Sequence, residues 1–537
     1  MSRWRGNPWA ILLTLSLGFF MTLLDLTIVN IAVPSMMDKL DASLDEALWV
    51  VNAYVLVLAV LLITAGRLGD LWGKKNLFIA GVLVFTLSSL ACGIAQDPAQ
   101  LIGARAVQGL GAALLMPQTM SIIIGVFPAE RRGAALGIWG AVAGVSTIAG
   151  PTVGGLLVTS LDWRWIFFVN LPIGALVLAM AVPILPGHTR TVRHRFDVTG
   201  VLLASAALFC LTFALTEGQK FEWNAVIWAL IAAGLALFVV FAVHQRGRQD
   251  GEPLVPFSLF RDRNFTILSL VGAAVSIGMV GIFLPMTIYL QSVLGFTALK
   301  AGLVMAPSSV MSMFLAPFAG RLSDRIGGKF ILICGLTLYA LGMLWLVATA
   351  QVSTNWTAFV PPLIVAGTGI GGVFAPMATE ATRNVPPQLA GAASGVNNTI
   401  RQVGSVLGSA AVGAVLQNRL AATLRDEATT RSSALPADMR PGFVEGFAKA
   451  AKNGLEVGAG QTGGRDKLSP GIPPGLAHRV QELSGQVFSH GFVHAMKPTM
   501  ALPVVVILLS AAACLTLKGR PTVPLTKADT AVTKIRT

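Results

Sequence analysis

Charged residues are scarce in this chain. They make up 12% of its 537 residues, against about 25% in an ordinary globular protein. Hydrophobic residues make up 54%. Apolar runs of about 20 residues, the length that crosses the hydrocarbon core of a bilayer, recur from Trp9 to Leu517. The runs are continuous rather than alternating, so they indicate helices rather than the strands of a barrel. The composition predicts an all-α polytopic membrane protein, embedded in the lipid bilayer, rather than a set of soluble domains.

Cysteine and histidine are also rare. The four cysteines all lie inside apolar segments, so they provide neither a disulfide framework nor a metal-binding spacing. His490 and His494 share a helical face, but we interpret them as solvated side chains rather than as metal ligands. A G-x-x-x-x-G-K-[ST] phosphate loop is missing, which argues against direct use of ATP. We expect no metal and no cofactor.

Basic residues outnumber acidic ones, giving a net charge of +14, but they form no patch or arm of the kind that binds nucleic acid. One set of short loops collects most of them: Arg3, Arg5, Lys74, Lys75, Arg131, Arg132, Arg190, Arg193, Arg195, Arg246, Arg248, Arg261, Arg263, Arg325, Lys329 and Arg383. The short loops opposite contain Lys39, Arg164, Lys220 and Lys300. The positive-inside rule therefore predicts that the first set of loops and both termini are cytoplasmic.

Fourteen membrane spans are predicted, near residues 9–33, 48–68, 77–96, 99–125, 134–158, 163–186, 198–216, 225–244, 264–290, 301–321, 330–350, 356–377, 391–418 and 496–517. The first run follows Arg3 and Arg5 as in a secretory signal, but it is longer than the roughly 7–15 apolar residues of such a signal. We expect a first bundle over 1–190, two linker helices over 191–262 and a second bundle over 263–537.

The second bundle contains a long extramembrane segment, near 419–495, and a cytoplasmic tail over 518–537. The first part of the segment is rich in Ala, Gly, Pro and charge, which favours mobility. Its end carries apolar residues at helical spacing: Leu476, Val480, Leu483 and Val487. This pattern predicts an amphipathic helix lying on the membrane surface.

An internal repeat indicates the architecture. The sequence GRLGDLWGK at 66–74 recurs as GRLSDRIGGK at 320–329. With one further offset, residues of the fourth and fifth spans match residues of the twelfth and thirteenth: Gly109 with Gly367, Gly111 with Gly369, Pro128 with Pro386, Gly133 with Gly391, Gly137 with Gly395 and Gly150 with Gly408. Spans 1–6 are thus repeated in parallel as spans 9–14, which predicts two six-helix bundles with a substrate site between them near the midplane.

The repeated loop contains charges that can act as a conformational latch. It has the form G-x-L-x-D-x-x-G-x-K/R, which resembles the signature of the major facilitator superfamily. In the first copy Asp70 can pair with Arg67, with Lys74 and with helix ends across the cytoplasmic gap. The second copy provides Asp324 and Arg325. The alternative is a basic loop with one stray acid, which the second copy argues against.

Span 4 carries an arginine at membrane depth, within LxxxRxxQGxGAA at 101–113. Arg105 shares a helical face with Gln108 and Met116. Because a charge at this depth costs at least about 2.5–3.5 kcal/mol, it is expected to face a cavity or a partner. The repeat places Leu363 at the equivalent position, so the charge belongs to one half only.

Span 5 contains a glycine–proline motif: Gly150, Pro151, Gly154 and Gly155. It resembles the sequence that marks the antiporter branches of that superfamily. Small residues allow close helix packing, and the proline is expected to introduce a bend. An ordinary glycine-rich packing face is the alternative.

Three further motifs extend the resemblance to nearly the whole chain: LDLTIVNIAVP at 24–34, WRWIFFVNLP at 163–172 and SGxxNxxR at 394–401. Together with the others they are similar to the fourteen-span drug:proton antiporters of the EmrB/QacA type. The resemblance implies a major facilitator fold, with 14 transmembrane helices as two six-helix bundles plus two inserted helices. It also implies a multi-pass protein of the cell membrane that acts as a monomer. Some relatives carry further acids in later spans, and spans 10 and 13 here contain none at mid-depth.

Asp25 is the candidate for proton coupling, with Arg105 as its partner. Its helical face carries small or polar residues that could line a cavity: Gly18, Thr22, Val29 and Ala32. A carboxyl group removed from water binds a proton more readily, so it can exchange protons at physiological pH. The alternative is a static Asp25–Arg105 ion pair. The candidates for lining a substrate cavity are Asn30, Asn52, Gln108, Met116, Trp139, Tyr289, Gln291, Asn398 and Arg401.

The leading functional hypothesis is proton-coupled efflux of hydrophobic or amphipathic small molecules. A dedicated exporter of one antibiotic or metabolite is the alternative within transport. A membrane enzyme would need convergent His, Cys or acidic groups at depth, which the spans do not offer. A membrane sensor without flux would keep the fold but lose coupling. We expect the partners to be protons and a drug-like molecule, without nucleic acid.

Overall fold

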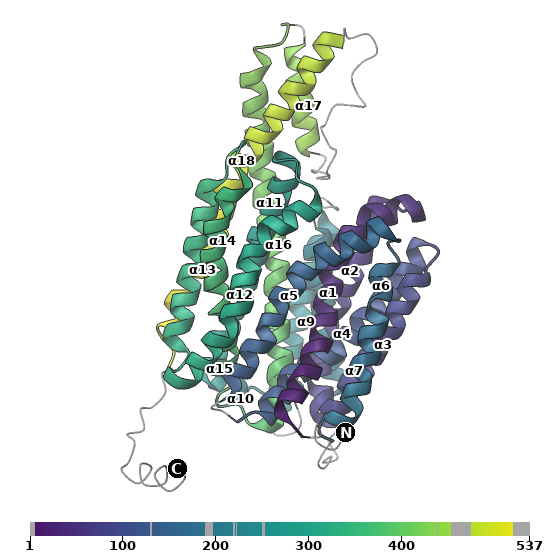
Figure 1. Cartoon of the computed structure of the whole chain (residues 1–537), viewed down its shortest axis with the longest axis vertical. Helices are drawn as coiled ribbons and strands as arrows, with labels where there is room; N and C mark the ends of the chain where they lie inside the picture. The colour runs from purple at the N-terminus through teal and green to yellow at the C-terminus, as the bar shows by residue number, and fades with distance from the viewer. Residues whose placement is uncertain are drawn as a thin grey trace.

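The computed structural model describes residues 6–128, 131–187, 197–218, 221, 223–249, 253–437, 439–452 and 474–518. Within these ranges every regular element is a helix, and the helices run side by side in a bundle (Figure 1). Fourteen helical segments in the described part are long and apolar enough to cross a membrane. The predicted all-α architecture with fourteen spans is therefore confirmed.

The first six spans are formed by α1 (Pro8–Leu40), α2 (Leu44–Trp72), α3 (Lys74–Ile94), α4 (Pro98–Val126), α5 (Arg132–Ser160), α6 (Trp165–Phe168) and α7 (Asn170–Ile184). Polar caps begin several of them: Asn7 accepts from the Trp9 N–H, and Ser43 forms a capping box with Glu46. The sixth predicted span is divided, because the helix breaks at Val169 between α6 and α7.

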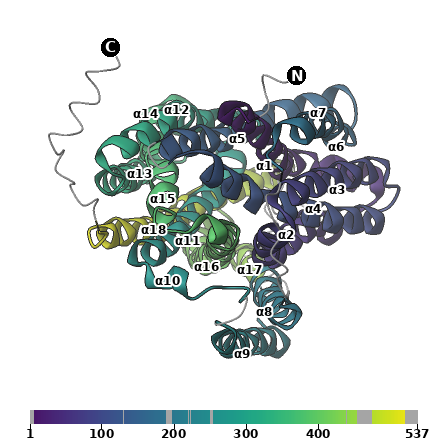
Figure 2. The same ribbon diagram turned by 90° about the horizontal axis from the view of Figure 1, so that it is seen from below.

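The inserted pair consists of α8 (Val198–Glu217) and α9 (Ala225–Gly247), followed by the short α10 (Ser258–Arg261). Seen from below, α8 and α9 lie at the edge of the bundle (Figure 2). α8 packs against α9, and it also contacts α2 of the first half and α16 of the second. The apolar cluster at this contact includes Ala204 of α8, Phe241 of α9 and Val396 of α16. The inserted pair thus bridges the two halves along one side.

The second half consists of α11 (Arg263–Ile288), η3 (Tyr289–Val293), α12 (Ala298–Ile326), α13 (Lys329–Thr349), η4 (Trp356–Phe359), α14 (Val360–Gly371), α15 (Phe374–Ala381), η5 (Pro387–Leu389), α16 (Ala390–Ser432), α17 (Arg440–Lys452) and α18 (Pro474–Cys514). The twelfth predicted span is broken after Gly371, so that η4, α14 and α15 cross together. The repeated turn needs a glycine in each half, because Gly73 and Gly327 have φ of 98° and 88°.

The predicted loop over 419–495 is largely helical where the structure describes it. α16 has 43 residues and α18 has 41, so each is about 60–65 Å long and exceeds the roughly 30 Å hydrocarbon core. Their ends project beyond the other helices together with α17 (Figure 1). We call this projecting part, Gln417–Lys452 with Pro474–Ala495, the extension. The residues 453–473, predicted to be mobile, and the tail 519–537 lie outside the described residues.

The prediction of a separate surface helix near the end of this segment is wrong. Leu483 and Val487 are 5% and 0% exposed, and Val487 belongs to the apolar core of the second half. They lie on the first part of α18, which pairs with α16: Thr423 donates to the Gly491 carbonyl at 2.9 Å. The apolar stripe therefore packs against a neighbouring helix instead of against lipid head groups. The Leu476 side chain lies outside the described residues.

Two seams join the halves, α5 against α12 and α2 against α16. Glycines allow the backbones to meet: a Cβ atom on Gly320 would lie 2.0 Å from the Gly133 carbonyl oxygen, and one on Gly66 would lie 2.6 Å from that of Gly391. No side chain fits at such distances, so a larger residue would force these helices apart. We call the end of the bundle that holds these contacts the latch end.

Candidate functional site

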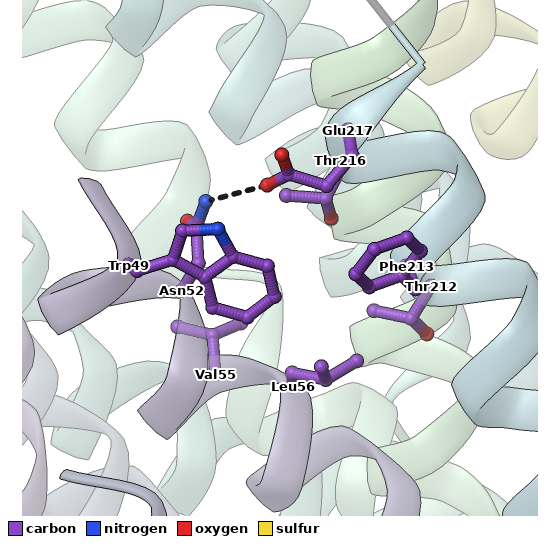
Figure 3. A pocket seen from close by; sticks show the side chains of 8 residues that line it. All are labelled: Trp49, Asn52, Val55, Leu56, Thr212, Phe213, Thr216 and Glu217. Carbon is purple, nitrogen blue, oxygen red and sulfur yellow. Dashed lines mark hydrogen bonds between the residues drawn. The ribbon is translucent and has the colours of Figure 1, made fainter. Parts of the chain in front are cut away.

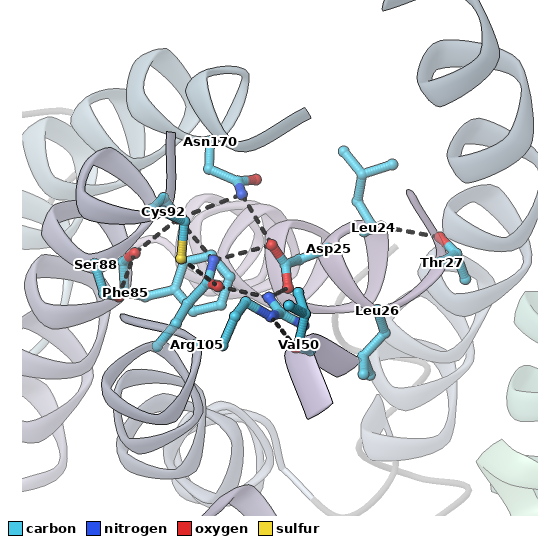
Figure 4. A network of polar contacts seen from close by, with 12 residues as sticks. Leu24, Asp25, Leu26, Thr27, Val50, Phe85, Ser88, Cys92, Arg105 and Asn170 are labelled. Carbon is cyan, nitrogen blue, oxygen red and sulfur yellow. Dashed lines mark hydrogen bonds and ion pairs between the residues drawn. The ribbon is translucent and has the colours of Figure 1, made fainter. Parts of the chain in front are cut away.

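Asp25 of α1 forms an ion pair with Arg105 of α4 inside the first half (Figure 4). Arg105 Nη1 donates to Asp25 Oδ2, and both side chains are 0% exposed. Charges buried in this way are tolerated when they are paired and hydrogen-bonded. The sequence predicted a proton-coupling role for both residues, with a static ion pair as the alternative, and the structure brings them into direct contact.

Two amide side chains donate hydrogen bonds to the other carboxylate oxygen of Asp25. Gln108 Nε2 donates to Asp25 Oδ1 at 2.9 Å, and Asn170 Nδ2 donates to the same oxygen at 3.2 Å. Ser89 Oγ accepts from Gln108 at 2.8 Å and so positions the amide. The carboxylate is therefore held by side chains from α4 and α7, which Ser89 of α3 positions in turn.

The guanidinium of Arg105 is held by α2. Its Nε donates to the Val50 carbonyl at 2.9 Å, and its Nη1 donates to Gln108 Oε1 at 2.6 Å. The Tyr54 ring lies beneath it, 4.4 Å from ring centroid to Cζ, which is a cation–π contact. Arg105 Nη2 and the Tyr54 hydroxyl have no hydrogen-bond partner among the described residues. The network is thus incomplete, and a rearrangement costs fewer bonds than in a saturated site.

The prediction that the Asp25 face of α1 lines a cavity is wrong for this conformation. Val29 and Ala32 are 0% exposed. A Cβ on Gly18 would lie 2.8 Å from the Phe78 ring. Small residues on this face serve close packing, as at Gly18 against Phe78 of α3 and Val177 of α7, rather than solvent access.

The predicted latch residues Asp70 and Asp324 bind helix ends across the seams. Asp70 accepts hydrogen bonds from the Gly391 and Ala392 N–H groups at 3.1 and 2.8 Å, at the start of α16. Asp324 accepts from the Gly133 and Ala134 N–H groups at 2.8 and 2.9 Å, at the start of α5. A carboxylate at a helix N-terminus satisfies free N–H groups and favours the positive end of the helix dipole.

The cations of the latch are arranged unequally. Lys74 Nζ lies 3.6 Å from Asp70 Oδ1, and Arg67 is 9% exposed beside it. Arg325 is exposed and takes no part in the bonds of Asp324 to α5. The two carboxylates therefore make equivalent contacts between the halves through backbone N–H groups.

The glycines of span 5 bring α5 against α1. A Cβ on Gly150 would lie 2.2 Å from Thr27 Oγ1, and one on Gly154 would lie 2.7 Å from Ile28 Cγ1. Gly155 faces Leu299 of α12 at the ordinary contact distance of 3.8 Å. The motif thus forms a close helix–helix contact. The side chain of Pro151, expected to bend the helix, lies outside the described residues.

Arg401 and Asn398 lie on α16, where the second half faces the first. Arg401 is partly exposed, its Cζ is 5.0 Å from the centroid of the Phe374 ring, and its Nε has no hydrogen-bond partner among the described residues. Asn398 Nδ2 donates to the carbonyl of Ser394 on its own helix at 2.9 Å. Ser394 in turn donates to the Pro117 carbonyl of α4 at 3.0 Å, which places this stretch against the first half.

The other cavity candidates do not form one group. Trp139 stacks on Phe19 at 4.2 Å between ring centroids, and Met116 packs beside the same core cluster. Asn30 is exposed and donates to the Leu26 carbonyl of its own helix at 2.9 Å. Asn52 lies in a pocket between α2 and α8 (Figure 3).

Tyr289 and Gln291, also predicted to line the cavity, lie in the π-helical turn η3 at the end of α11. Tyr289 is 0% exposed, packs on Phe359 and donates to the Gln351 carbonyl at 2.5 Å. The assignment of Tyr289 to an open cavity is wrong here, because the ring belongs to the core of the second half.

Sequence reasoning missed three polar residues of these sites. Asn170 and Ser89 complete the shell of Asp25, although Asn170 stands in the motif at 163–172. An amide inside an apolar span was the available signal. Glu217, which is 6% exposed, was overlooked because the predicted span ended at 216.

Comparison with known proteins agrees with this architecture. The model of the Major Facilitator Superfamily matches residues 15–409. The uncharacterized MFS-type transporter Rv1250 of Mycobacterium tuberculosis is 43% identical over 78% of this chain and 72% of its own length. The multidrug resistance protein Stp of the same species is 36% identical over 77% and 76%. The tetracenomycin C resistance and export protein of Streptomyces glaucescens is 32% identical over 96% and 93%.

Solved structures share the fold. The human organic anion transporter MFSD10 aligns over 93% of this chain and 99% of its own, with a TM-score of 0.58 at 12% identity. The proton:xylose symporter XylE aligns over 83% and 94%, with a TM-score of 0.54 at 15% identity. Fourteen helices of the described part are long and apolar enough to cross a membrane, and the family model covers most of the chain, so the chain belongs to the major facilitator superfamily.

Proposed function

We propose that this protein is a proton-coupled exporter of hydrophobic or amphipathic small molecules that works as a monomer by alternating access in the cell membrane. Relatives named for multidrug resistance, for tetracenomycin C export and for puromycin resistance support export of drug-like compounds. The short basic loops support an orientation with both termini in the cytoplasm. The latch end then faces the cytoplasm.

The sealed Asp25–Arg105 pair is the observation that carries the proposal. Among the described residues of the first half, Asp25 is an acid that is wholly buried, with its charge balanced by one arginine. When a proton binds Asp25, the carboxyl group loses its charge and releases Arg105, whose other contacts reach α2 and α4. Protonation of Asp25 therefore changes the contacts among α1, α2 and α4. A static ion pair would keep these contacts unchanged through the transport cycle.

The latch supports a state closed to the cytoplasm. Asp70 and Asp324 each join one half to the first turn of a helix in the other. Breaking these contacts separates α2 from α16 and α5 from α12 at this end, which opens the cytoplasmic side. In this scheme protonation of Asp25 and release of the latch alternate, so that protons move inward as substrate moves outward.

Substrate would bind where the halves face each other. Phe374 of the second half lies 3.8 Å from the Cβ position of Gly140 in α5, and Arg401 lies on the Phe374 ring. Trp139, which precedes Gly140 in the sequence, stacks on Phe19. Aromatic and apolar side chains with few polar groups suit amphipathic compounds. A dedicated exporter of one antibiotic would use the same path with a narrower profile, so a susceptibility panel that shows resistance to a single compound would favour that alternative.

Asp25→Asn tests the coupling. In proteoliposomes with an imposed proton gradient, we expect the wild type to drive a transported dye uphill. The variant should lose this uphill transport by about 100-fold, because the amide cannot exchange a proton. Exchange of substrate for substrate without a gradient should persist, since it needs no net proton movement.

Asp38→Asn, which removes an exposed acid from the far end of the same helix, is the matched control and should transport normally. Uphill transport by Asp25→Asn at the wild-type rate would show that the proton binds elsewhere. If the wild type moved none of a broad panel of compounds, transport itself would be excluded.

A further inference from the structure

Arg401 carries a positive charge deep inside the second half. It follows the start of α16 at Ala390 by about three turns, which places it roughly 16 Å along the helix, near the middle of a hydrocarbon core of about 30 Å. Within the described part of the chain, the guanidinium forms no ion pair, and its buried Nε has no hydrogen-bond partner. A charge at this depth is costly unless another group compensates it.

Arg105, the arginine of the first half at membrane depth, is compensated in full. Asp25 forms an ion pair with it, and the Val50 carbonyl accepts from its Nε at 2.9 Å. Arg401 instead lies on the ring of Phe374, with 5.0 Å between its Cζ and the ring centroid. This cation–π contact uses no N–H group as a hydrogen-bond donor, so the donors of the Arg401 guanidinium remain available to a ligand.

Two further polar atoms beside Arg401 also lack partners among the residues that the structure describes. A Cβ on Gly272 of α11 would lie 3.1 Å from Arg401 Cγ and 3.6 Å from Asn397 Oδ1, so both side chains pass over this glycine. Asn397 is 4% exposed, and its Oδ1 accepts no hydrogen bond. Ser269, one turn before Gly272, is also buried with an unpartnered hydroxyl. Because buried polar groups are normally hydrogen-bonded, such a cluster indicates a site for a polar ligand group.

The cluster can be reached from the place where the two halves meet. Phe374 of α15, which lies against Arg401, has its Cβ 3.8 Å from the Cβ position of Gly140 in α5 of the first half. Arg401 is itself partly exposed, so a molecule between the halves can contact the guanidinium. Charged residues at membrane depth that keep such access are typical of substrate paths.

The acids of the second half stand away from this point. Asp324 and Glu380 lie at the latch end, where each accepts a hydrogen bond from a backbone N–H group. α11 and α13 contain no acid, and the first acids of α16 and α18, Asp426 and Glu482, belong to the extension. The positive charge of Arg401 is therefore not balanced by an acid at mid-depth in its own half.

An anionic group supplies what this site lacks. A carboxylate or a similar anion accepts hydrogen bonds from a guanidinium in a planar, paired geometry and cancels its charge. A cation at the same place is repelled, and a neutral molecule leaves the charge unbalanced. Among amphipathic compounds, the site therefore favours those with a negatively charged group.

We propose that Arg401 selects amphipathic substrates that carry a carboxylate or a similar anionic group, and that it binds this group between the halves. The inference rests on the proposed function, since it names the class of compound that the exporter carries. An anion that leaves the cell and a proton that enters move charge in the same direction. A membrane potential that is negative inside therefore drives both movements.

Binding of three matched dyes tests the site. Dansyl-6-aminohexanoate, its primary amide and dansylcadaverine share the aromatic group and the alkyl chain, and they end in a carboxylate, an amide and an ammonium group. Fluorescence titration of the purified full chain, in an uncharged detergent and without a proton gradient, should show at least about tenfold tighter binding of the carboxylate than of the amide. The ammonium dye should bind more weakly than the amide.

Arg401→Gln should remove the preference for the carboxylate and leave the affinity for the amide unchanged, which also shows that the variant is folded. Arg401→Lys should retain part of the preference, because it keeps the charge but not the planar donor pair. Arg419→Gln, which removes an exposed arginine from the extension end of the same helix, is the matched control and should retain all of it.

Equal binding of the carboxylate and the amide to the wild type, or an unchanged preference in Arg401→Gln, would overturn the inference and leave Arg401 a solvated side chain. Asp25→Asn should bind the three dyes as the wild type does, because the assay needs no proton movement. A wild type that prefers the carboxylate but transports nothing would contradict the proposed function alone. A wild type that transports without this preference would contradict the inference alone.

Discussion

The Asp25–Arg105 pair shows how two charges become acceptable inside an apolar bundle. Each is 0% exposed, and each is a liability without the other. Their hydrogen-bond partners lie on α2, α4 and α7, so the pair depends on the packing of these helices. Local sequence alone does not provide such a network.

A double-mutant cycle measures this coupling. Asp25→Leu and Arg105→Leu each leave one buried charge unpaired, and each should lower the free energy of unfolding by about 3–5 kcal/mol. The double variant removes both charges and should be more stable than either single variant. Thermal unfolding of the purified proteins measures all four states. Additive losses would show that the two side chains are not energetically linked.

Arg401 is expected to behave differently. Its Nε has no hydrogen-bond partner among the described residues and it forms no ion pair there, so Arg401→Ala should not lower the thermal unfolding temperature. Because the side chain lies on Phe374, whose Cβ is near Gly140 of the first half, the variant should reduce export at least about tenfold, with Arg401→Lys intermediate. Unfolding and transport measured on the same preparations separate the two effects. A destabilised variant with normal export would assign Arg401 to packing instead.

At the scale of helices, the latch is repeated as faithfully as the sequence motif. Asp70 with α16 and Asp324 with α5 are the same contact in two copies, since Gly133 and Gly391 are themselves equivalent in the repeat. The following lysines repeat as well. Lys75 donates to the Leu185 carbonyl near the end of α7, and Lys329 to that of Leu517 after α18. In each copy of the repeated loop, the aspartate therefore bonds across one seam and the lysine bonds the end of a helix in its own half.

Loss of either latch carboxylate should favour separation of the halves. Asp70→Asn and Asp324→Asn each weaken two hydrogen bonds made by a charged group, worth about 1.5–3 kcal/mol apiece. The open state at this end should gain about tenfold or more in population, and the double variant should gain more. Spin labels at the exposed positions 76 and 330 report the distance across the latch end. An unchanged distance distribution in the double variant would remove the carboxylates from the latch.

At the scale of the molecule, the transmembrane layout was predictable because lipid imposes length and apolarity on each span. The need of Asp25 and Arg105 for partners was also predictable, since charges inside such spans are costly alone. Gln108 was expected to line a substrate cavity, and instead it is buried against Asp25. The shell of this pair was not predictable, because Ser89 and Asn170 arrive from helices that only folding brings together. The extension was mistaken for a loop, since hydropathy does not detect a polar helix. Its burial comes from pairing between α16 and α18, which are distant in sequence.

The helix α16 runs without a break from the latch end into the extension. The helix starts at Ala390, where Asp70 holds it, and continues to Ser432 in the extension. A rotation of the second half by about 10° about the latch would swing the tip through about 11 Å, given a helix about 65 Å long. The extension therefore magnifies the state of the carrier at a surface far from the transport path. An antibody fragment that binds both the extension and the first half would stop the transport cycle without occupying the substrate site.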